Sequence, residues 1–330
     1  MSSFRTIVSV TKPPFAIAHG DGIVSMGSCF SEHIGRNFER FKFDIDINPF
    51  GQQYNPASIT TAIHRLLANI SYTATELIEQ DGLYHSLDHH GSFSRGTIEE
   101  TLDAINKKRV ASSQNIKKAN ILFLTLGTAH VFKWRETGLV VSNCHKIPSA
   151  KFEMELLKPE VIVAILKDAL TALWLVNPTV QVIFTVSPVR YFAFGHYDNT
   201  VSKAHLFTAI HSLQALYPQL YYFPAYEMMM DDLRDYRFYA DDMLHPSSVA
   251  IDYIWKTLCN TVISKETIAV LKAVEEIRTA STHRPHQPHS DAHRRFVTIT
   301  LQRIAEMEAL LGLNFEQEKS NLTNYSLSER

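Results

Sequence analysis

The feature that most constrains the fold of this chain is the alternation of short apolar runs with longer amphipathic stretches. Such alternation is typical of βαβ units, in which parallel strands form a sheet that helices cover on both faces. Five apolar runs fit strands, at residues 22–26, 43–47, 120–125, 180–186 and 220–223. The sequence therefore predicts an α/β three-layer sandwich around a five-stranded parallel sheet.

Helix signals fill most of the intervals between these runs. The first predicted helix begins at the sequence GSCF, and Asn55-Pro56 reads as the start of another, with an N-cap and a proline at the first helical position. Further helices are expected at 158–175, 201–217 and 247–263. Run 43–47 alternates apolar residues with aspartate, which predicts an edge strand. The polar region 79–118 reads as an insertion with some helix near its end.

The 330 residues divide at about position 263. Residues 1–263 are predicted to form the α/β domain, and residues 264–330 a helical extension. Within the extension, 279–293 reads as a linker because it holds prolines, histidines and small polar residues. A last helix is expected at 294–311, followed by a loose polar tail beyond Glu316.

Composition narrows the classes of partner and compartment. The formal net charge is −2, without the basic excess of a nucleic-acid-binding protein. No apolar stretch reaches the length of a membrane span, and the first residues lack the apolar core of a secretory signal. The three cysteines, Cys29, Cys144 and Cys259, fit neither a disulfide framework nor a zinc motif. We therefore expect a cytoplasmic protein with reduced thiols, no membrane span and no nucleic-acid partner.

Polar residues that follow the predicted strands are the candidates for chemistry, because ligands bind beyond the carboxyl ends of parallel strands. After the first strand, Gly27 allows a tight turn that leaves Ser28 and Cys29 at the amino end of a helix. Free N–H groups and the helix dipole at such an end stabilise a thiolate or an oxyanion. Either side chain is a candidate nucleophile.

Two further strand ends complete a possible acyl-transfer site. Asp242 and His245 stand three residues apart before a proline, so that the aspartate could orient the imidazole while the other ring nitrogen accepts the proton of the nucleophile. Gly127 and Thr128 follow the third strand and could line an oxyanion site. Each residue type also has a structural reading, with Cys29 as a small buried residue, Asp242 and His245 as a capping loop, and His130 as a core histidine.

Several of these motifs, in this order, resemble those of the GSCFA-domain proteins. The matching segments are Gly27-Ser28-Cys29-Phe30, Asn48-Pro49-Phe50-Gly51, Tyr54-Asn55-Pro56, Thr125-Leu126-Gly127-Thr128, Ser187-Pro188-Val189-Arg190, Tyr236 to Asp242, and His245-Pro246-Ser247. That group in turn resembles the SGNH (GDSL-type) esterases and acyltransferases. The resemblance implies a flavodoxin-like sheet and matches an Asp-x-x-His motif to Asp242 and His245.

The resemblance leaves the nucleophile and the oxyanion donors open. Laying Gly27 on the glycine of the SGNH Gly-Asp-Ser block places Cys29 on the nucleophilic serine, whereas a shift by one residue selects Ser28. The glycine spacing favours Cys29, and cysteine with histidine and aspartate is a workable acyl-transfer set, since a thiolate forms readily beside an imidazole and a helix amino end. The asparagine of the SGNH Gly-x-Asn-Asp block is missing after Gly127. Candidate donors in its place are Thr128, Asn48, Asn55 and the N–H group of Gly51.

The predicted function is thus that of an ester hydrolase or acyltransferase without metal or cofactor, acting on a small-molecule or carbohydrate acyl ester, a lipid or a thioester. Arg190 is expected either to bind an acidic substrate group or to pair with Asp231, Asp232 or Asp235. The alternative is a non-catalytic carbohydrate- or partner-binding module on the same fold. The sequence does not specify the oligomeric state.

Overall fold

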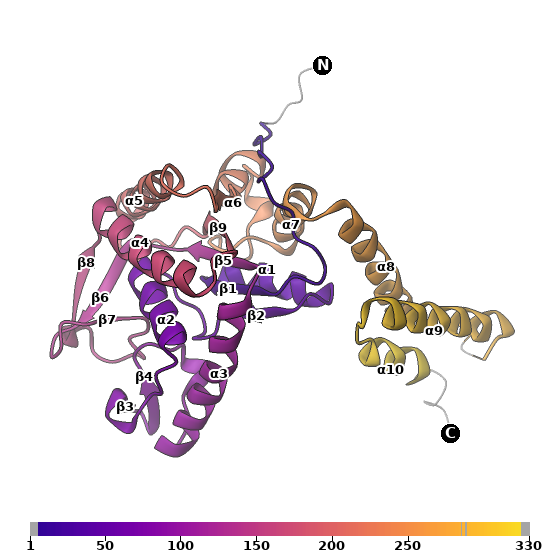
Figure 1. Cartoon of the computed structure of the whole chain (residues 1–330), viewed down its shortest axis with the longest axis horizontal. Coiled ribbons are helices and arrows are strands. Elements are labelled where there is room, and N and C mark those ends of the chain that lie inside the picture. Colours follow the sequence, from indigo (N-terminus) through magenta and orange to yellow (C-terminus); the bar gives the residue numbers. More distant parts are fainter. Residues whose placement is uncertain (1–5, 285, 288, 325–330) are drawn as a thin grey trace.

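A five-stranded parallel sheet forms the centre of the computed structural model, which describes residues 6–284, 286–287 and 289–324. Its strands are β1 (Ile23–Gly27), β2 (Ile45–Ile47), β5 (Ile121–Leu126), β9 (Gln181–Val186) and β10 (Leu220–Tyr222), in the order β10-β9-β5-β1-β2. Counted along the chain, this order is 2-1-3-4-5, that of flavodoxin-like doubly wound sheets. The predicted α/β fold is confirmed (Figure 1).

Burial on both faces explains the sequence of the central strands. All six residues of β5 are buried, as are five of the six in β9, and both strands read as nearly continuous apolar runs. β2 alternates and lies at the edge of the sheet, as predicted. Successive side chains along each strand therefore contribute to two separate cores, one on each face.

Helices cover the two faces in two layers (Figure 1). One core packs α2 (Pro56–Ala68), α3 (Ile98–Lys118), α4 (Pro159–Val176) and α5 (His196–Gln214) against the sheet. The other core holds α1 (Cys29–Arg40), α6 (Ala225–Glu227) and α7 (Ser248–Val262) on the opposite face. The short helical turns are η1 (Ala74–Glu76), η2 (Gly91–Phe93), η3 (Ser149–Lys151), η4 (Met228–Asp232) and η5 (Tyr236–Phe238).

Side-chain caps begin the helices where the sequence predicted them. Ser28 caps α1, Asn55 caps α2 with Pro56 as its first residue, and Ser247 caps α7. In each case the cap oxygen accepts a hydrogen bond from a first-turn N–H group that has no partner within the helix. These caps set the points where the chain turns from loop to helix at the carboxyl end of the sheet.

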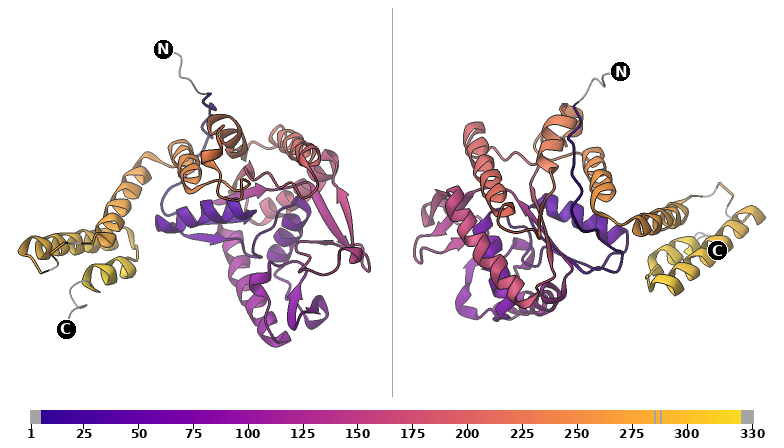
Figure 2. Two further views of the ribbon diagram at one scale, coloured as in Figure 1. Left: turned by 180° about the vertical axis from the view of Figure 1, so that it is seen from behind. Right: turned by 45° about the horizontal axis from the view of Figure 1, so that its top comes forward.

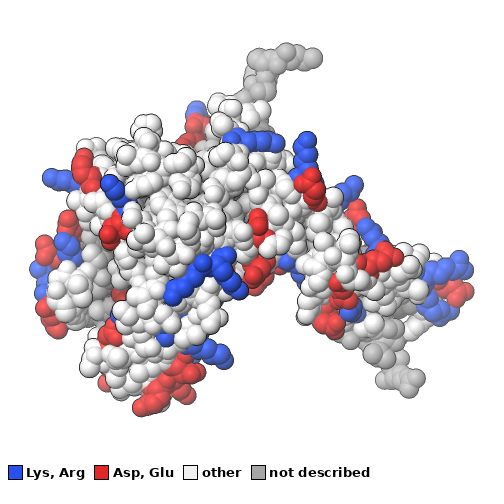
Figure 3. Space-filling view, viewed as in Figure 1, with Lys and Arg blue, Asp and Glu red and all other residues white. Residues whose placement is uncertain are grey.

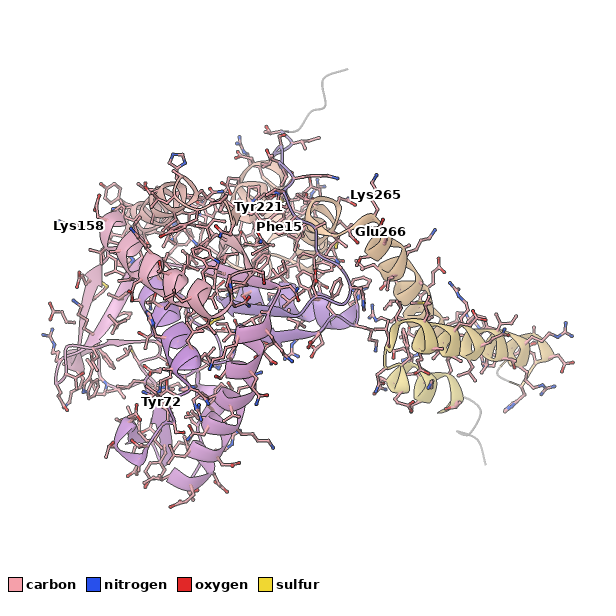
Figure 4. All side chains as sticks on the ribbon, in the orientation of Figure 1. Phe15, Tyr72, Lys158, Tyr221, Lys265 and Glu266 are labelled. Carbon is pink, nitrogen blue, oxygen red and sulfur yellow. The ribbon has the colours of Figure 1, made fainter. Side chains whose placement is uncertain are left out.

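The region 79–118 is more regular than the sequence predicted. It contains the antiparallel hairpin of β3 (Leu77–Gln80) and β4 (Leu83–Ser86), and then the whole of α3, 21 residues long. Small polar residues, Thr101, Ser112 and Ser113, occupy buried positions of α3 and interrupt its apolar period. Tyr72, which precedes the hairpin, donates a hydrogen bond to Asp88 Oδ2 at 2.8 Å (Figure 4).

A second, antiparallel sheet was not predicted. It consists of β6 (His130–Trp134), β7 (Val140–Val141) and β8 (Phe152–Leu156), in the order β7-β6-β8, and lies at the left in Figure 1. Its strands follow β5 directly, so this sheet stands beside the carboxyl end of the parallel sheet. That position makes it a wall of the site described below.

The C-terminal helices form an arm that projects from the α/β body in all three ribbon views (Figures 1 and 2). The arm consists of α8 (Lys265–Thr282), α9 (Asp291–Leu311) and α10 (Glu316–Asn324), and it starts at the labelled Lys265 and Glu266 (Figure 4). Ion pairs from Arg40 to Glu275 (2.7 Å) and from Lys42 to Glu318 (2.9 Å) tie it to the body.

Two expectations for this extension need correction. The segment predicted as a loose tail beyond Glu316 forms α10, because Leu322 is buried against the core of the arm. The predicted linker 279–293 is helical at both ends, since α8 runs to Thr282 and α9 starts at Asp291. Positions 285 and 288 of that linker and the last residues, 325–330, lie outside the described residues.

The N-terminal segment lies against the part of the body from which the arm starts, since the N–H group of Ile17 donates to the carbonyl oxygen of Val262 at 2.7 Å. Tyr221 donates a hydrogen bond to the carbonyl group of Thr11 at 2.7 Å, and its ring meets that of Phe15 edge-on at 6.3 Å (Figure 4). On the face drawn in Figure 3, acidic and basic side chains are intermingled. Within the described residues, the model contains no helix with the length and apolar character needed to cross a membrane.

The end of β1 yields a stability prediction. Gly27 has a φ of +145°, and a Cβ atom at this position would lie 2.2 Å from the carbonyl oxygen of Thr125. We expect Gly27→Ala to lower the free energy of unfolding by at least about 2 kcal/mol, since strain and overlap with backbone combine. Urea denaturation measures the change. Gly20→Ala, in open space, is the matched control, and an equal effect of both substitutions would contradict the prediction.

Candidate active site

The turn after β1 is held by hydrogen bonds to β5 and to the residue that follows β2. The N–H group of Gly27 donates to Asn48 Oδ1 at 3.0 Å, and the N–H group of Ser28 donates to the carbonyl oxygen of Thr125 at 3.3 Å. Ser28 is 1% exposed, and its hydroxyl oxygen accepts the N–H group of Phe30 at 3.3 Å. The Ser28 side chain thus acts as the N-cap of α1.

Cys29 is the first residue of α1 and is half-buried. Burial raises the pKa of its thiol, while the N–H groups of Phe30 and of Cys29 itself, followed by the charge of Lys203, act in the opposite direction. Burial prevails over the helix end, so the pKa is raised rather than lowered. The sequence-based expectation of a readily formed thiolate therefore needs correction, because the resting group is a thiol that requires a base.

Asp242 and His245 form a hydrogen-bonded pair on the loop before α7. Asp242 Oδ2 lies 2.6 Å from His245 Nδ1, and Oδ1 accepts the N–H groups of His245 and Leu244, each at 2.9 Å. These two N–H groups and the imidazole hold the pKa of Asp242 at about 2, so the carboxylate stays ionised at neutral pH. With Nδ1 occupied, Nε2 is the ring nitrogen left to exchange a proton.

One cavity of about 430 Å³ brings the predicted nucleophiles and this imidazole together. Ser28, Cys29 and His245 all line it, as do Asn55, Gly127 and Thr128. The side chains of His245 and Asp242 are 42% and 47% exposed, so the imidazole lies at the solvent-accessible rim of the cavity that the half-buried thiol also lines. The cavity lies beyond β1 and β5, where the strand order reverses, and this is where doubly wound sheets bind ligands.

The remaining lining residues come mostly from the antiparallel sheet with the segment after β7 and from the segment after β9, with one residue before α2 and one before α7. They are Tyr54, His130, Phe132, Val141, Ser142, Asn143, Cys144, Ser187, Val189, Tyr191, Phe194 and Leu244. Aromatic rings dominate one side, where Phe194 packs against His130 with ring centroids 4.8 Å apart. A larger cavity, of about 880 Å³, lies between α7, α8 and α9, and its lining includes none of the predicted site residues.

The predicted oxyanion donors are mostly engaged elsewhere. The N–H groups of Gly127 and Thr128 both donate to the carbonyl oxygen of Tyr54, at 2.7 and 2.9 Å. Asn55 uses both side-chain atoms to cap α2 through Ser58. The Thr128 hydroxyl lies 3.0 Å from that of Ser202 and accepts the N–H group of His130. These bonds support the walls of the cavity rather than point into it.

Asn48 and Gly51 lie away from this cavity. Both line a separate cavity of about 390 Å³, bounded by polar side chains of α1. The N–H group of Gly51 donates to the carbonyl oxygen of Asn48 at 2.7 Å, which closes a tight turn, and a Cβ at Gly51 would meet His90 Cβ at 2.2 Å. The turn thus uses the N–H group that the sequence offered as an oxyanion donor.

Arg190 does not form the alternative pairs considered from the sequence. Asp231 pairs with Arg234 at 2.6 Å, Asp232 accepts the hydroxyl of Tyr253 at 2.6 Å, and Asp235 lies 3.8 Å from Arg237. The guanidinium of Arg190 instead lies over the ring of Phe192 at 5.0 Å, with its Nε atom buried and without a hydrogen-bond partner. Arg190 is also absent from the residues that line the cavity of Cys29 and His245, so these contacts support neither of the roles expected from the sequence.

Sequence reasoning missed Lys203 altogether. It lies within α5 and is 2% exposed, and its Nζ donates to the carbonyl oxygen of Ser187 at 2.7 Å. Burial lowers the pKa of this ammonium group to about 7, against the charge of Cys29, which favours the protonated form. A lysine in an amphipathic stretch reads as solvent-exposed, so only the fold reveals its position. His130, taken as a core histidine, also lines the cavity.

Comparison with known proteins gives two family matches. A model described as the GSCFA family matches residues 22–258, and one described as the C-terminal domain of GSCFA domain proteins matches residues 274–325. No curated protein matches the chain. Among the described residues, no group of three or more histidine, cysteine, aspartate or glutamate side chains is arranged to hold a metal ion.

The buried lysine predicts a pH dependence of stability. The pKa of Lys203 is lower in the folded protein than in the unfolded chain, so the unfolded chain binds more protons above pH 7. The free-energy cost of burying the Lys203 ammonium group therefore falls as the pH rises, and the folded protein becomes more stable. The unfolding free energy of wild type minus that of Lys203→Met should rise by about 2 kcal/mol between about pH 7 and 9. Urea titrations measure it. For Lys167→Met, an exposed control in α4, the difference should stay flat.

Proposed function

The chain belongs to the GSCFA family, and on this premise we propose that it is an SGNH-type enzyme that hydrolyses or transfers acyl esters. The observation that carries the proposal is the shared cavity of Cys29 and His245, with Asp242 bonded to the imidazole. A nucleophile, a base within the same cavity and a carboxylate that orients the base are the parts that acyl transfer requires.

We assign the nucleophile to Cys29 rather than Ser28. The hydroxyl oxygen of Ser28 is committed to the N–H group of Phe30, and the side chain is 1% exposed. Cys29 is half-buried and stands at the first helical position, next to N–H groups that stabilise negative charge on sulfur. The raised pKa of Cys29 makes a neighbouring base necessary, which gives His245 its role.

The proposed reaction proceeds in two halves. Cys29 Sγ attacks the carbonyl carbon of the ester as its proton passes to His245 Nε2, and a tetrahedral oxyanion forms. The ester bond then breaks, the alkoxide leaves with the proton from Nε2, and an acyl thioester remains on Cys29. Water or a sugar hydroxyl gives a proton to Nε2 and attacks the thioester, which releases the acid or the new ester and restores the thiol.

The oxyanion is assigned to the first turn of α1. The N–H groups of Gly127 and Thr128 already donate to Tyr54, so the free N–H groups at the start of the helix, beginning with that of Cys29, are the available donors. The positive end of the helix dipole adds to their effect. A donor set built from main chain fits a chain that lacks the SGNH asparagine.

The lining of the cavity suits the acyl part of a small substrate. Phe132, Tyr191 and Phe194 offer an aromatic side for it. Acylated carbohydrates, lipids and thioesters remain the proposed substrate classes. The three free cysteines suit a reducing compartment, so we propose a cytoplasmic location.

A binding module on the same fold is the second candidate. It is favoured by one observation, that the two N–H groups after β5 donate to Tyr54 instead of facing the cavity. Such a module would bind an acylated carbohydrate in the same cavity without turnover. It predicts ligand binding that survives substitution of Cys29 by alanine.

Hydrolysis of p-nitrophenyl acetate by single variants tests the proposal. We expect Cys29→Ala to abolish activity and His245→Ala to lower kcat/KM by at least about 100-fold, because the base is lost. Asp242→Asn should act in the same direction through the orientation of the imidazole. Ser28→Ala should cost about 1 kcal/mol of stability through loss of the cap while leaving most of the activity.

Cys259→Ala is the control, since Cys259 is a free cysteine that does not line the cavity of Cys29 and His245. Its activity should equal that of wild type. Activity that is untouched by His245→Ala would end the triad proposal. Loss of activity with Ser28→Ala but not with Cys29→Ala would move the nucleophile to Ser28.

A further inference from the structure

Lys203 is a buried cation without a carboxylate. Its side chain is 2% exposed, and none of the ion pairs formed by the described residues involves it. Burying an ammonium group costs several kcal/mol unless an opposite charge or hydrogen bonds compensate. The single bond to the carbonyl oxygen of Ser187 satisfies one of its three protons. A nearby anion would lower the free-energy cost of keeping this ammonium group protonated.

The groups that surround Lys203 indicate which side chain could supply this anion. Ser187, at the end of β9, contributes its carbonyl oxygen, and Tyr226, in α6, presents its ring 5.5 Å from Nζ. Arg190, after β9, has the same charge as Lys203 and disfavours its protonation. Ser187 lines the same cavity as Cys29, so the ammonium group bonded to Ser187 lies directly behind the wall of that cavity. Cys29, at the start of α1, is the acidic group whose charge favours protonation of Lys203, and the charge of Lys203 in turn favours the Cys29 thiolate.

We propose that Lys203 is the buried counter-charge of the Cys29 thiolate, a positioning residue that acts from behind the wall of the cavity. The proposal rests on the proposed function, in which Cys29 loses its proton to His245. Lys203 keeps its own proton during this transfer, so the thiolate forms beside an ammonium ion instead of in an uncompensated buried site. Lys203 does not line the cavity, and it therefore acts on sulfur rather than on substrate.

This pairing explains how a half-buried thiol can serve as a nucleophile. Glu32, one turn along α1, disfavours the thiolate, and burial does so more strongly. The first-turn N–H groups and the charge of Lys203 act in the opposite direction and favour the thiolate. Because Lys203 is buried, its charge is weakly screened by solvent, and its effect on a neighbouring sulfur exceeds that of an exposed lysine.

The pH dependence of alkylation distinguishes this role from a structural one. Iodoacetamide reacts with thiolates, so its rate at Cys29 reports the thiolate fraction without any turnover of substrate. Wild type, Lys203→Met and Lys203→Arg would be labelled between pH 6 and 9, with peptide mass spectrometry giving the rate at each cysteine. Cys144 is the internal control, because it lines the same cavity and burial alone raises its pKa.

At pH 6, where Lys203 is protonated, we expect Cys29 of wild type to react about tenfold faster than Cys29 of Lys203→Met. The ratio should narrow to within about twofold by pH 9, as Lys203 loses its proton above its pKa of about 7. Lys203→Arg, which cannot lose its charge, should stay faster than Lys203→Met at both pH values. Rates at Cys144 should agree among the three proteins.

Equal rates at Cys29, or a ratio that is constant with pH, would overturn the proposal. If Lys203→Met misfolds, buried Cys259 becomes reactive, and a measurement without substitution at Lys203 decides. Wild type carrying a negative carboxymethyl group on Cys29 should then show a higher pKa of Lys203, by NMR of the lysine side chain, than wild type carrying a neutral carbamidomethyl group. Equal values would likewise overturn it.

The alkylation experiment tests the role of Lys203, and the ester-hydrolysis experiment tests the proposed function, so the failure of one can be told from the failure of the other. A protein with the expected alkylation ratio but no ester hydrolysis retains the Lys203 pairing and loses the proposed activity. A hydrolase that depends on Cys29 and His245 but shows a flat ratio retains the activity and loses the role of Lys203.

Discussion

The close approach of Gly27 to the carbonyl group of Thr125 sets the geometry on which the candidate site depends. That oxygen occupies the space of a Cβ atom at Gly27 and accepts the N–H group of Ser28. The chain must therefore leave β1 at once, and the Ser28 hydroxyl becomes the cap of α1. Cys29 is fixed at the first helical position as a result, at the carboxyl ends of β1 and β5, where the strand order reverses.

Local signals made much of this arrangement predictable. The glycine turn at Gly27, the cap at Asn55 and the three-residue spacing of Asp242 and His245 each depend on neighbours in sequence, and the structure forms all three. The wall made by β6, β7 and β8 depends on antiparallel pairing between residues up to 26 positions apart, from His130 to Leu156, for which the sequence carries no local signal. Burial of Lys203 likewise follows from the packing of α5 and not from its sequence.

The sequence likewise did not predict that two of the expected oxyanion donors, Asn48 and Gly51, lie outside the cavity of Cys29 and His245. The motif that contains Asn48 and Gly51 predicts them as oxyanion donors, but short-range hydrogen bonds determine how their polar groups are used. Gly51 closes its turn through Asn48, and the side chain of Asn48 holds the N–H group of Gly27. These residues thus shape the turn that carries Ser28 and Cys29 from outside the cavity, and a motif position alone does not distinguish such support from contact with substrate.

The contrast between a half-buried thiol and an exposed imidazole has a chemical consequence. Burial keeps Cys29 protonated at rest, and the thiolate is the form that oxidants attack, so the resting thiol is protected. The pair of His245 and Asp242 stands at the rim, where the N–H groups of His245 and Leu244 and the imidazole keep the carboxylate ionised by lowering its pKa to about 2. In the proposed reaction, a substrate that fills the cavity would exclude water from the thiol, which would strengthen the electrostatic interactions of the nascent thiolate.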